Sequence, residues 1–233
     1  MTTASTAKDV AFGDNRFLQI LCVLFLMVFT ALAIHPVMVE DWWLENGLVF
    51  LFAGFLIGTY RWLPFSQLSY LLIFVYLCMH EWGAHYRYAL DPIGEWLKQF
   101  QGTTRNQFDR WTHFAFGLLM YYPQREVLMR RAGLGAPWSL WIPVVLLLGY
   151  GAAYEIIEAM AAAVLSPDAG DAFLALQGDP WDTHKDMFMA LAGGTSAMTV
   201  TFAVIAWRSR RPKTLAALAT GGPQSREVPR KRA

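Results

Sequence analysis

Six stretches of this chain are apolar over about the length that a helix needs to cross a membrane. They cover residues 17–34, 44–60, 68–88, 108–122, 139–165 and 186–207, and the fourth can continue as helix to residue 131. No water satisfies backbone N–H and C=O groups in the hydrocarbon core, so such segments fold as α-helices or as closed barrels. A spanning helix needs about 20 apolar residues, whereas a barrel strand needs only about 10. The sequence therefore predicts an all-α fold, a bundle of six transmembrane helices with short loops.

The composition agrees with a multi-pass membrane protein that has little soluble mass. Charged residues make up 16% of the chain and hydrophobic residues 55%, whereas an ordinary soluble domain has about 25% charged residues. No Gly-rich phosphate loop, Gly-x-Ser-x-Gly elbow or His-Glu-x-x-His motif occurs. We therefore expect membrane lipids as partners and no nucleic acid, and no protein partner can be named.

Three regions follow from this pattern. Residues 1–16 are polar and are expected to be a disordered cytoplasmic segment, residues 17–207 form the six-helix domain, and residues 208–233 form a basic disordered cytoplasmic tail. The first apolar stretch also resembles a signal peptide, because Lys8 and Arg16 precede it. Its length exceeds the usual apolar core of about 7–15 residues, so we expect it to be retained as a helix, with cleavage as the alternative.

Basic residues predict the orientation of the bundle. With the N-terminus inside, most of them fall on cytoplasmic segments, and most loop acids fall on the opposite face. This asymmetry places both termini in the cytoplasm. On the outer side, Ile93, Trp96, Leu97 and Phe100 follow the spacing i, i+3, i+4, i+7. This stripe predicts a short periplasmic interfacial helix that lies on the membrane surface.

Ionisable residues inside the apolar stretches gather toward the outer side of the predicted bundle. The third to sixth stretches carry His80, Glu81, His85, Asp109, His113, Glu155, Glu158 and Asp186, and Asp182 lies four residues before the sixth. A carboxylate at the centre of a bilayer costs roughly 2.5–3.5 kcal/mol on insertion scales. Spacings of three or four residues place each pair on one helix face. We therefore expect these four helices to converge on one polar site in the outer half, with the first two helices packed outside it.

Three interpretations of this cluster stay open. The first is a divalent metal site (Zn, Mn or Fe), because imidazole and carboxylate ligands without thiolate suit these ions. Its candidate ligands are His80, His85, Asp109, His113, Glu155, Glu158 and Asp186. The second is a structural network of ion pairs with Arg87, Arg110 or Arg105. The third is a path for protons or ions.

The corresponding functions differ in class. A metal site predicts a membrane-embedded hydrolase acting on a lipid-linked substrate, with Glu81 or Asp182 as the general base. The alternatives are a small ion-coupled transporter and a structural or assembly protein. Whether the protein is an enzyme stays open at this point.

Four short stretches carry a family resemblance. They are residues 80–88 (HEWGAHYRY), 109–114 (DRWTHF), 154–158 (YEIIE) and 177–182 (QGDPWD). Together they resemble the signature stretches of the YjdF-type bacterial inner-membrane proteins, over roughly residues 15–207. The resemblance implies a location in the bacterial inner membrane and a single domain, and it implies no established activity.

Overall fold

The computed structural model describes residues 11–164 and 177–210. Over these residues all regular structure is helical, which confirms the predicted all-α class. A short 3₁₀ helix (Phe12–Asp14) precedes the α-helices, which are α1 (Arg16–Leu32), α2 (Val39–Thr59), α3 (Gln67–Tyr86), α4 (Pro92–Gln101), α5 (Phe108–Arg130), α6 (Trp138–Val164) and α8 (Asp182–Arg210). Most of the predicted N-terminal segment and of the predicted basic tail lies outside the described residues.

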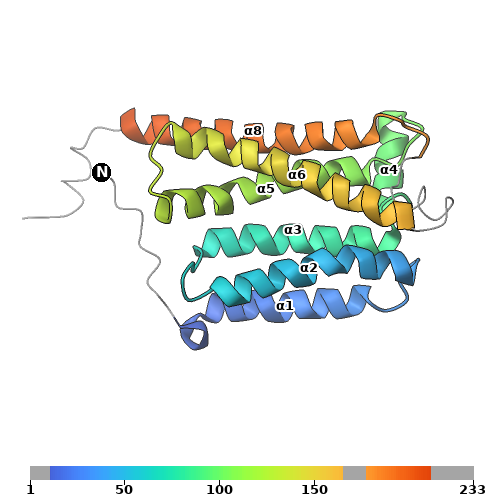
Figure 1. Cartoon of the computed structure of the whole chain (residues 1–233), viewed down its shortest axis with the longest axis horizontal. Coiled ribbons are helices and arrows are strands. Elements are labelled where there is room, and N and C mark those ends of the chain that lie inside the picture. The colour runs from blue at the N-terminus through green and yellow to red at the C-terminus, as the bar shows by residue number, and fades with distance from the viewer. Residues whose placement is uncertain (1–10, 165–176, 211–233) are drawn as a thin grey trace, which may run out of the picture.

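The long helices lie side by side, and α4 crosses one end of the bundle (Figure 1). On one side α1 and α2 pack against α3, and on the other α6 and α8 pack against α5. The two groups meet where α3 contacts α5. The helix α3 and the helix α5 are therefore the inner helices, and they carry most of the polar residues discussed below.

Length and apolar composition identify fewer membrane spans than the sequence pattern predicted. Among the described helices, α2, α6 and α8 are long and apolar enough to cross a membrane, and α1 is a shorter apolar helix. The helices α3 and α5 carry His80, Glu81, Asp109, Arg110 and His113, which lower their hydropathy. Because other helices surround them, they can hold polar side chains without presenting them to lipid.

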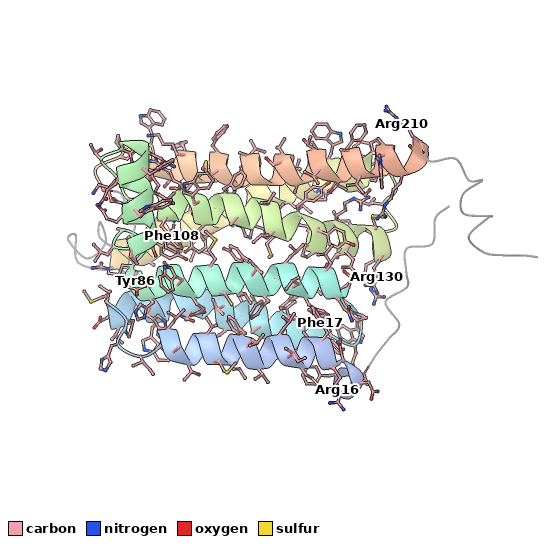
Figure 2. All side chains as sticks on the ribbon, turned by 180° about the vertical axis from the view of Figure 1, so that it is seen from behind. Arg16, Phe17, Tyr86, Phe108, Arg130 and Arg210 are labelled. Atoms are coloured by element: carbon pink, nitrogen blue, oxygen red, sulfur yellow. The ribbon has the colours of Figure 1, made fainter. Side chains whose placement is uncertain are left out.

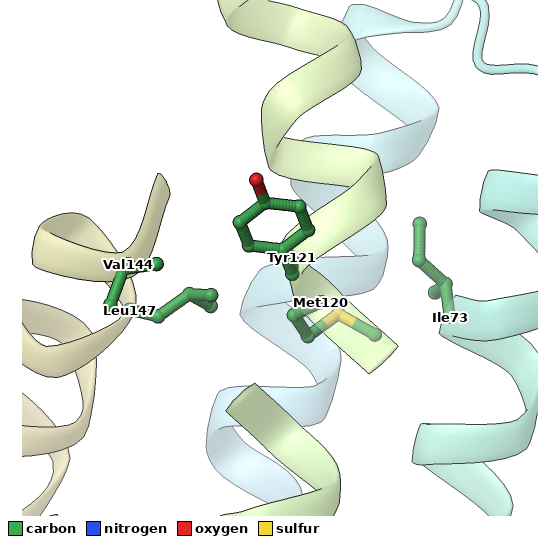
Figure 3. Close-up of a cluster of buried hydrophobic side chains, with 5 residues drawn as sticks. All are labelled: Ile73, Met120, Tyr121, Val144 and Leu147. Carbon is green, nitrogen blue, oxygen red and sulfur yellow. The ribbon is translucent and has the colours of Figure 1, made fainter. Parts of the chain in front are cut away.

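A buried apolar cluster joins α3, α5 and α6. Met120 lies between Ile73 on one side and Leu147 on the other (Figure 3). Tyr121 is fully buried, and its hydroxyl donates a hydrogen bond of 3.1 Å to the carbonyl oxygen of Leu140. This pairing satisfies the polar atom of the tyrosine, so the ring can sit in the apolar interior.

The closest helix contact, between α5 and α8, depends on glycine. A Cβ atom on Gly117 would lie 2.0 Å from the carbonyl oxygen of Ala190, and one on Gly193 would lie 2.0 Å from that of Phe114. Small residues at such positions let two helix backbones approach closely. This contact fixes the relative rotation of α5 and α8, and so decides which of their side chains face each other.

The start of α5 is held by the turn into α4. Asp91 caps α4 by accepting a hydrogen bond of 2.7 Å from the N–H of Gly94. Asn106 donates to the carbonyl of Asp91 (2.8 Å) and accepts from the N–H of Phe108 (3.0 Å). On α4, Trp96 and Phe100 are 60% and 78% exposed. The helix crosses the bundle end with its apolar stripe uncovered, an arrangement typical of the interfacial helix that the sequence predicts.

Candidate functional site

A cavity of about 600 Å³ lies between α2, α3, α5 and α6. One end is polar and includes the side chains of His80, Tyr88, Asp109 and His113. The rest is lined mostly by apolar side chains, down to residues near the far end of α5 such as Val127. Its size falls within the range of about 300–1,000 Å³ that is usual for ligand sites. The cavity is therefore amphipathic along its length, with polar groups at the end near α4 and an apolar limb along α5.

At the polar end, α5, α6 and α8 bring three acidic side chains together around one histidine. One ligand atom from each of Asp109, His113 and Asp186 lies within 4.8 Å of the others. The Nε2 atom of His113 is 3.5 Å from a carboxylate oxygen of Asp109 and 3.4 Å from one of Glu155. Asp186 Oδ1 and Glu155 Oε1 are buried, and neither has a hydrogen-bond partner among the described residues. We call Asp109, His113, Glu155 and Asp186 the inner layer.

Closer to the end of the bundle, a second set of charged residues forms ion pairs, which we call the outer layer. Arg105 pairs with Asp182, and its guanidinium is also 3.6 Å from Asp109. Arg110 is 2.5 Å from Asp179 and 3.4 Å from Asp182. These pairs connect the start of α5 to the turn that leads into α8. They match the ion-pair interpretation of the cluster, but for the outer layer only.

Asp179 lies in the turn before α8 and belongs to the outer layer. Its Oδ2 atom is 2.5 Å from Lys185 Nζ, and its Oδ1 accepts a hydrogen bond of 3.1 Å from the N–H of Trp181. The hydrogen bond from Lys185, followed by that from the backbone and that from Arg110, holds the pKa of this carboxyl well below its usual range. The charged form of Asp179 is thus the form that the turn stabilises.

Charges in the inner layer do not balance. It contains three carboxylates and one imidazole, and among the described residues the arginine that pairs with it is Arg105, 3.6 Å from Asp109. Arg105 also pairs with Asp182, so it is shared between the layers. Buried carboxylates are stable only when they are paired, protonated or bound to a cation. The inner layer therefore has the charge and the ligand types to hold a divalent metal ion or protons.

The opposite wall of the polar end comes from α2, α3 and the turn after α3. The hydroxyl of Tyr88 is 2.7 Å from Nδ1 of His80, and Nε2 of His80 is 3.9 Å from a carboxylate oxygen of Glu45. Tyr154 of α6 donates a hydrogen bond of 2.7 Å to the same oxygen of Glu45. The prediction that the first two helices pack outside the site is wrong for α2, which lines the cavity and contributes Glu45 to its polar end.

The turn that carries Tyr88 is strained. Arg87 and Tyr88 have φ angles of 56° and 48°, in the left-handed region that residues with a Cβ seldom adopt. The ring of Tyr88 packs over Gly83, where an added Cβ would lie 2.4 Å from the ring. Arg87 is anchored to Asp41 of α2 at 2.5 Å. This turn holds the hydroxyl of Tyr88 against Nδ1 of His80, and Nε2 is then the ring nitrogen on the side of Glu45.

Some residues that the sequence placed in the shared site lie elsewhere. Nδ1 of His85 is 2.7 Å from the carbonyl oxygen of Leu32 in α1. Glu81 is fully buried and is not among the residues that line the cavity; Asn46 of α2 is near enough to interact with it. Glu158 is half-buried one turn beyond Tyr154 and is near enough to interact with that tyrosine and with Glu45, at the margin of the polar end. The structure thus brings His80, Asp109, His113, Glu155 and Asp186 to the polar end.

The missed residues had weak sequence signals. Glu45 lies at the very start of the second apolar stretch, and in the sequence it groups with the outer acids Glu40 and Asp41 that precede it closely. In the structure α2 begins at Val39, so Glu45 lies inside the helix and is only 6% exposed. Tyr88 and Tyr154 are common residue types near membrane surfaces, and nothing in their spacing marks them as partners of His80 and Glu45.

Comparison with known proteins places the chain in a family. Residues 17–207 match the family described as "Predicted membrane protein (DUF2238)". The chain belongs to this family. Over 179 residues it is 32% identical to inner membrane protein YjdF of Escherichia coli (strain K12), a match that covers 76% of this chain and 84% of that protein. No solved structure matches the chain.

Membership of the DUF2238 family confirms the resemblance found in the sequence, and it identifies the chain as an integral membrane protein similar to an inner-membrane protein. The whole polar end of the cavity falls inside the residues that match the family. The site is therefore part of the domain that defines the family, and not of the terminal segments that flank it.

Proposed function

We propose that this protein is a membrane-embedded, metal-dependent hydrolase that acts on a lipid-linked substrate. One observation carries the proposal: Asp109 and His113 line the polar end of a cavity that is otherwise apolar, and Asp186 lies close enough to both to share a metal ion with them. Small side-chain movements would bring their ligand atoms to about 2.0–2.2 Å from a shared ion, as zinc requires. Imidazole with two carboxylates and no thiolate suits Zn, Mn or Fe.

The inner layer also supplies a candidate base. A bound divalent metal lowers the pKa of its water toward ~7. Glu155 lies beside His113 and has a carboxylate oxygen without a hydrogen-bond partner among the described residues, so it is placed to accept a proton. Glu81 lies near Asn46 of α2 and not beside His113, and Asp182 is paired with two arginines. Glu155 therefore replaces both of them as the proposed base.

Metal content tests the first half of the proposal. Detergent-purified protein, stripped by chelator and reloaded with Zn, Mn or Fe, is expected to retain one ion per chain by elemental analysis. Asp186→Asn and His113→Ala should lose this ion. Glu95→Gln is the matched control, because Glu95 is an acid on the exposed helix α4, where it pairs with Lys98. Equal metal content in the stripped wild type, the reloaded wild type and Asp186→Asn would contradict the metal site.

Hydrolysis is tested in a separate assay, which offers the protein a mixture of membrane lipids instead of one selected substrate. Metal-loaded protein in liposomes of bacterial inner-membrane lipids is expected to release water-soluble head groups that mass spectrometry detects. Chelator and Glu155→Gln should abolish the release, and Glu95→Gln should leave it unchanged. Metal binding without any released product would reject the hydrolase while keeping the metal site.

One feature favours a second candidate, a small ion-coupled transporter. The cavity extends along α5 from Asp109 near its start to Leu128 near its end, so it covers most of the length of the helix. A transporter would carry protons or ions across liposomes that contain the protein, and a pH-sensitive dye inside them would report this. Flux that depends on His113, without product release, would favour transport over hydrolysis.

We further propose six spans, formed by α1, α2, α3, α5, α6 and α8, with both termini in the cytoplasm. The distribution of arginine supports this orientation. Arg16, Arg130 and Arg210 lie at one end of the bundle, and Tyr86 and Phe108 lie at the other (Figure 2). Basic residues favour the cytoplasmic side. Alkaline phosphatase fused after Trp207 is expected to be inactive, and strong activity there would reverse the orientation.

A further inference from the structure

The mouth of the cavity is marked by side chains that both line it and reach the outside. Phe55 of α2 and Tyr150 and Ile157 of α6 line the cavity, yet they are 51%, 55% and 46% exposed. Since α2 and α6 are not among the helix pairs in close contact, the cavity opens between them. Both lie on the same side of the layer formed by α3 and α5 (Figures 1 and 2). In an integral membrane protein this opening faces lipid and not water.

The apolar limb has the dimensions of one hydrocarbon chain. From His113 to Val127 the cavity follows α5 for roughly 21 Å, at about 1.5 Å per residue. That is about two-thirds of a hydrocarbon core of ~30 Å. A methylene group is about as large as a water molecule, whose share of liquid volume is ~30 Å³. A cavity of about 600 Å³ then has room for a hydrocarbon chain of roughly 20 such groups, the size of one lipid chain.

We propose that the substrate is a single-chain amphiphile, fatty acyl or isoprenoid, that enters sideways from the membrane between α2 and α6. Its chain lies along α5 past Phe116 and Met120, and its polar head lies between His80 and the inner layer. Apolar side chains along the limb exclude water from the chain, and polar side chains at the one end receive the head group. This inference rests on the proposed function for the reaction at the polar head group of the substrate. Binding of its hydrocarbon chain can be tested without any turnover.

Photolabelling from the lipid phase tests chain binding. The probe is a photoactivatable long-chain fatty alcohol, added to liposomes that contain the full chain, with labelled residues mapped by mass spectrometry. Met120 lines the cavity and is only 8% exposed, so surrounding lipid cannot label it from outside. Val144 is equally buried at 5% exposed but does not line the cavity, and Phe202 is 60% exposed on α8.

We expect labelling of Met120 and Phe202 but not of Val144. Ala153→Trp should block the opening and abolish labelling of Met120 while leaving that of Phe202, because Ala153 lines the cavity and is exposed on α6. Ala203→Trp makes the same change on the exposed face of α8 and should have no effect. If Met120 is labelled no more than Val144 in the wild type, the proposal is overturned, whether or not Ala153→Trp folds.

Competition with unlabelled lipids identifies the type of hydrocarbon chain that the cavity binds. Loss of Met120 labelling with excess unlabelled fatty alcohol or with an isoprenoid alcohol supports the proposal and shows which source fits. Loss with a two-chain phospholipid alone contradicts it. Asp186→Asn separates this inference from the proposed function: the variant should lose the metal but keep the labelling of Met120. Metal binding with no labelling of Met120 would leave the metal site standing and reject the single-chain substrate.

Discussion

Arg105 is the cation on which the stability of the outer layer depends most. Its side chain is 6% exposed and pairs with Asp182, which is 2% exposed, and with Asp109. Removing one partner of a buried pair costs about 3–5 kcal/mol, because the other charge is left uncompensated. Arg105→Met keeps most of the side-chain length and removes the charge. We therefore expect this variant to lose about 3–5 kcal/mol of stability.

Arg110→Met provides the matched comparison. Arg110 and its nearer partner Asp179 have side chains that are 17% and 19% exposed, and its contact with buried Asp182 is longer, at 3.4 Å. Pairs that reach solvent contribute only about 0.2–1 kcal/mol. For a chain of this size, 1 kcal/mol corresponds to a shift of about 2–4 °C in the melting temperature. Arg105→Met should therefore lower the melting temperature in detergent by roughly 6–20 °C, and Arg110→Met by no more than about 4 °C.

A double variant checks the cause. If the loss in Arg105→Met comes from an unpaired carboxylate, then Asp182→Asn added to it should restore part of the melting temperature. Fluorescence-monitored thermal unfolding of the purified variants in one detergent measures all of these shifts. The reasoning is refuted if the two arginine variants lose the same small amount, or if the double variant is no more stable than Arg105→Met alone.

Three further predictions use the same assay. Gly193→Ala should cost about 1–3 kcal/mol, because its Cβ would lie 2.0 Å from the carbonyl oxygen of Phe114, whereas Gly54→Ala, with nothing within 4 Å, should be neutral or stabilising. Glu126→Gln should cost about 1.5–3 kcal/mol, since the carboxylate accepts hydrogen bonds from the N–H and the hydroxyl of Ser66 and pairs with Arg130. Asp179→Asn should be less stable than the wild type at pH ~7 and at pH ~5, and the difference should vanish at lower pH. The sign follows because a carboxyl whose pKa is held below the unfolded value of about 3.9 stabilises the fold above that pH and loses the effect as pH falls through its own pKa.

Helix positions followed well from the sequence, because hydropathy is a local property. The first apolar stretch, residues 17–34, corresponds to α1 (Arg16–Leu32), and the stripe from Ile93 to Phe100 corresponds to α4 (Pro92–Gln101). The gathering of polar residues toward one end of the bundle was also predictable, since helices of similar length with short loops must alternate in direction. The position of the cavity mouth was not predictable, because it depends on where the backbones of two helices, α2 and α6, stay apart.

The spacing of residues could not predict how each helix is rotated about its own axis. His80 and Glu81 are neighbours in the chain, but successive residues of a helix point about 100° apart. In the structure His80 faces the cavity, whereas Glu81 does not line it and is near Asn46 of α2. The pair Glu81 and His85 does share a face, as expected, but that face is turned toward α1 and α2. Contacts made by the whole helix set this rotation, and no single pair of residues reveals it.

The metal and ion-pair interpretations stop competing once the cluster is divided by depth. Near the end of the bundle, where Arg110 and Lys185 still reach solvent, carboxylates are paired with basic side chains. Deeper in, around His113, carboxylate oxygens of Glu155 and Asp186 are buried without a hydrogen-bond partner among the described residues. A long basic side chain can pair with an acid near the surface and keep its stem in the apolar region, but a compact cation is the better partner at depth. Asp109 lies between the two layers, 3.6 Å from Arg105 and 3.5 Å from His113. The outer ion pairs thus close the end of the bundle, and the inner acids that they leave without a basic partner are the ones that we propose bind a metal ion.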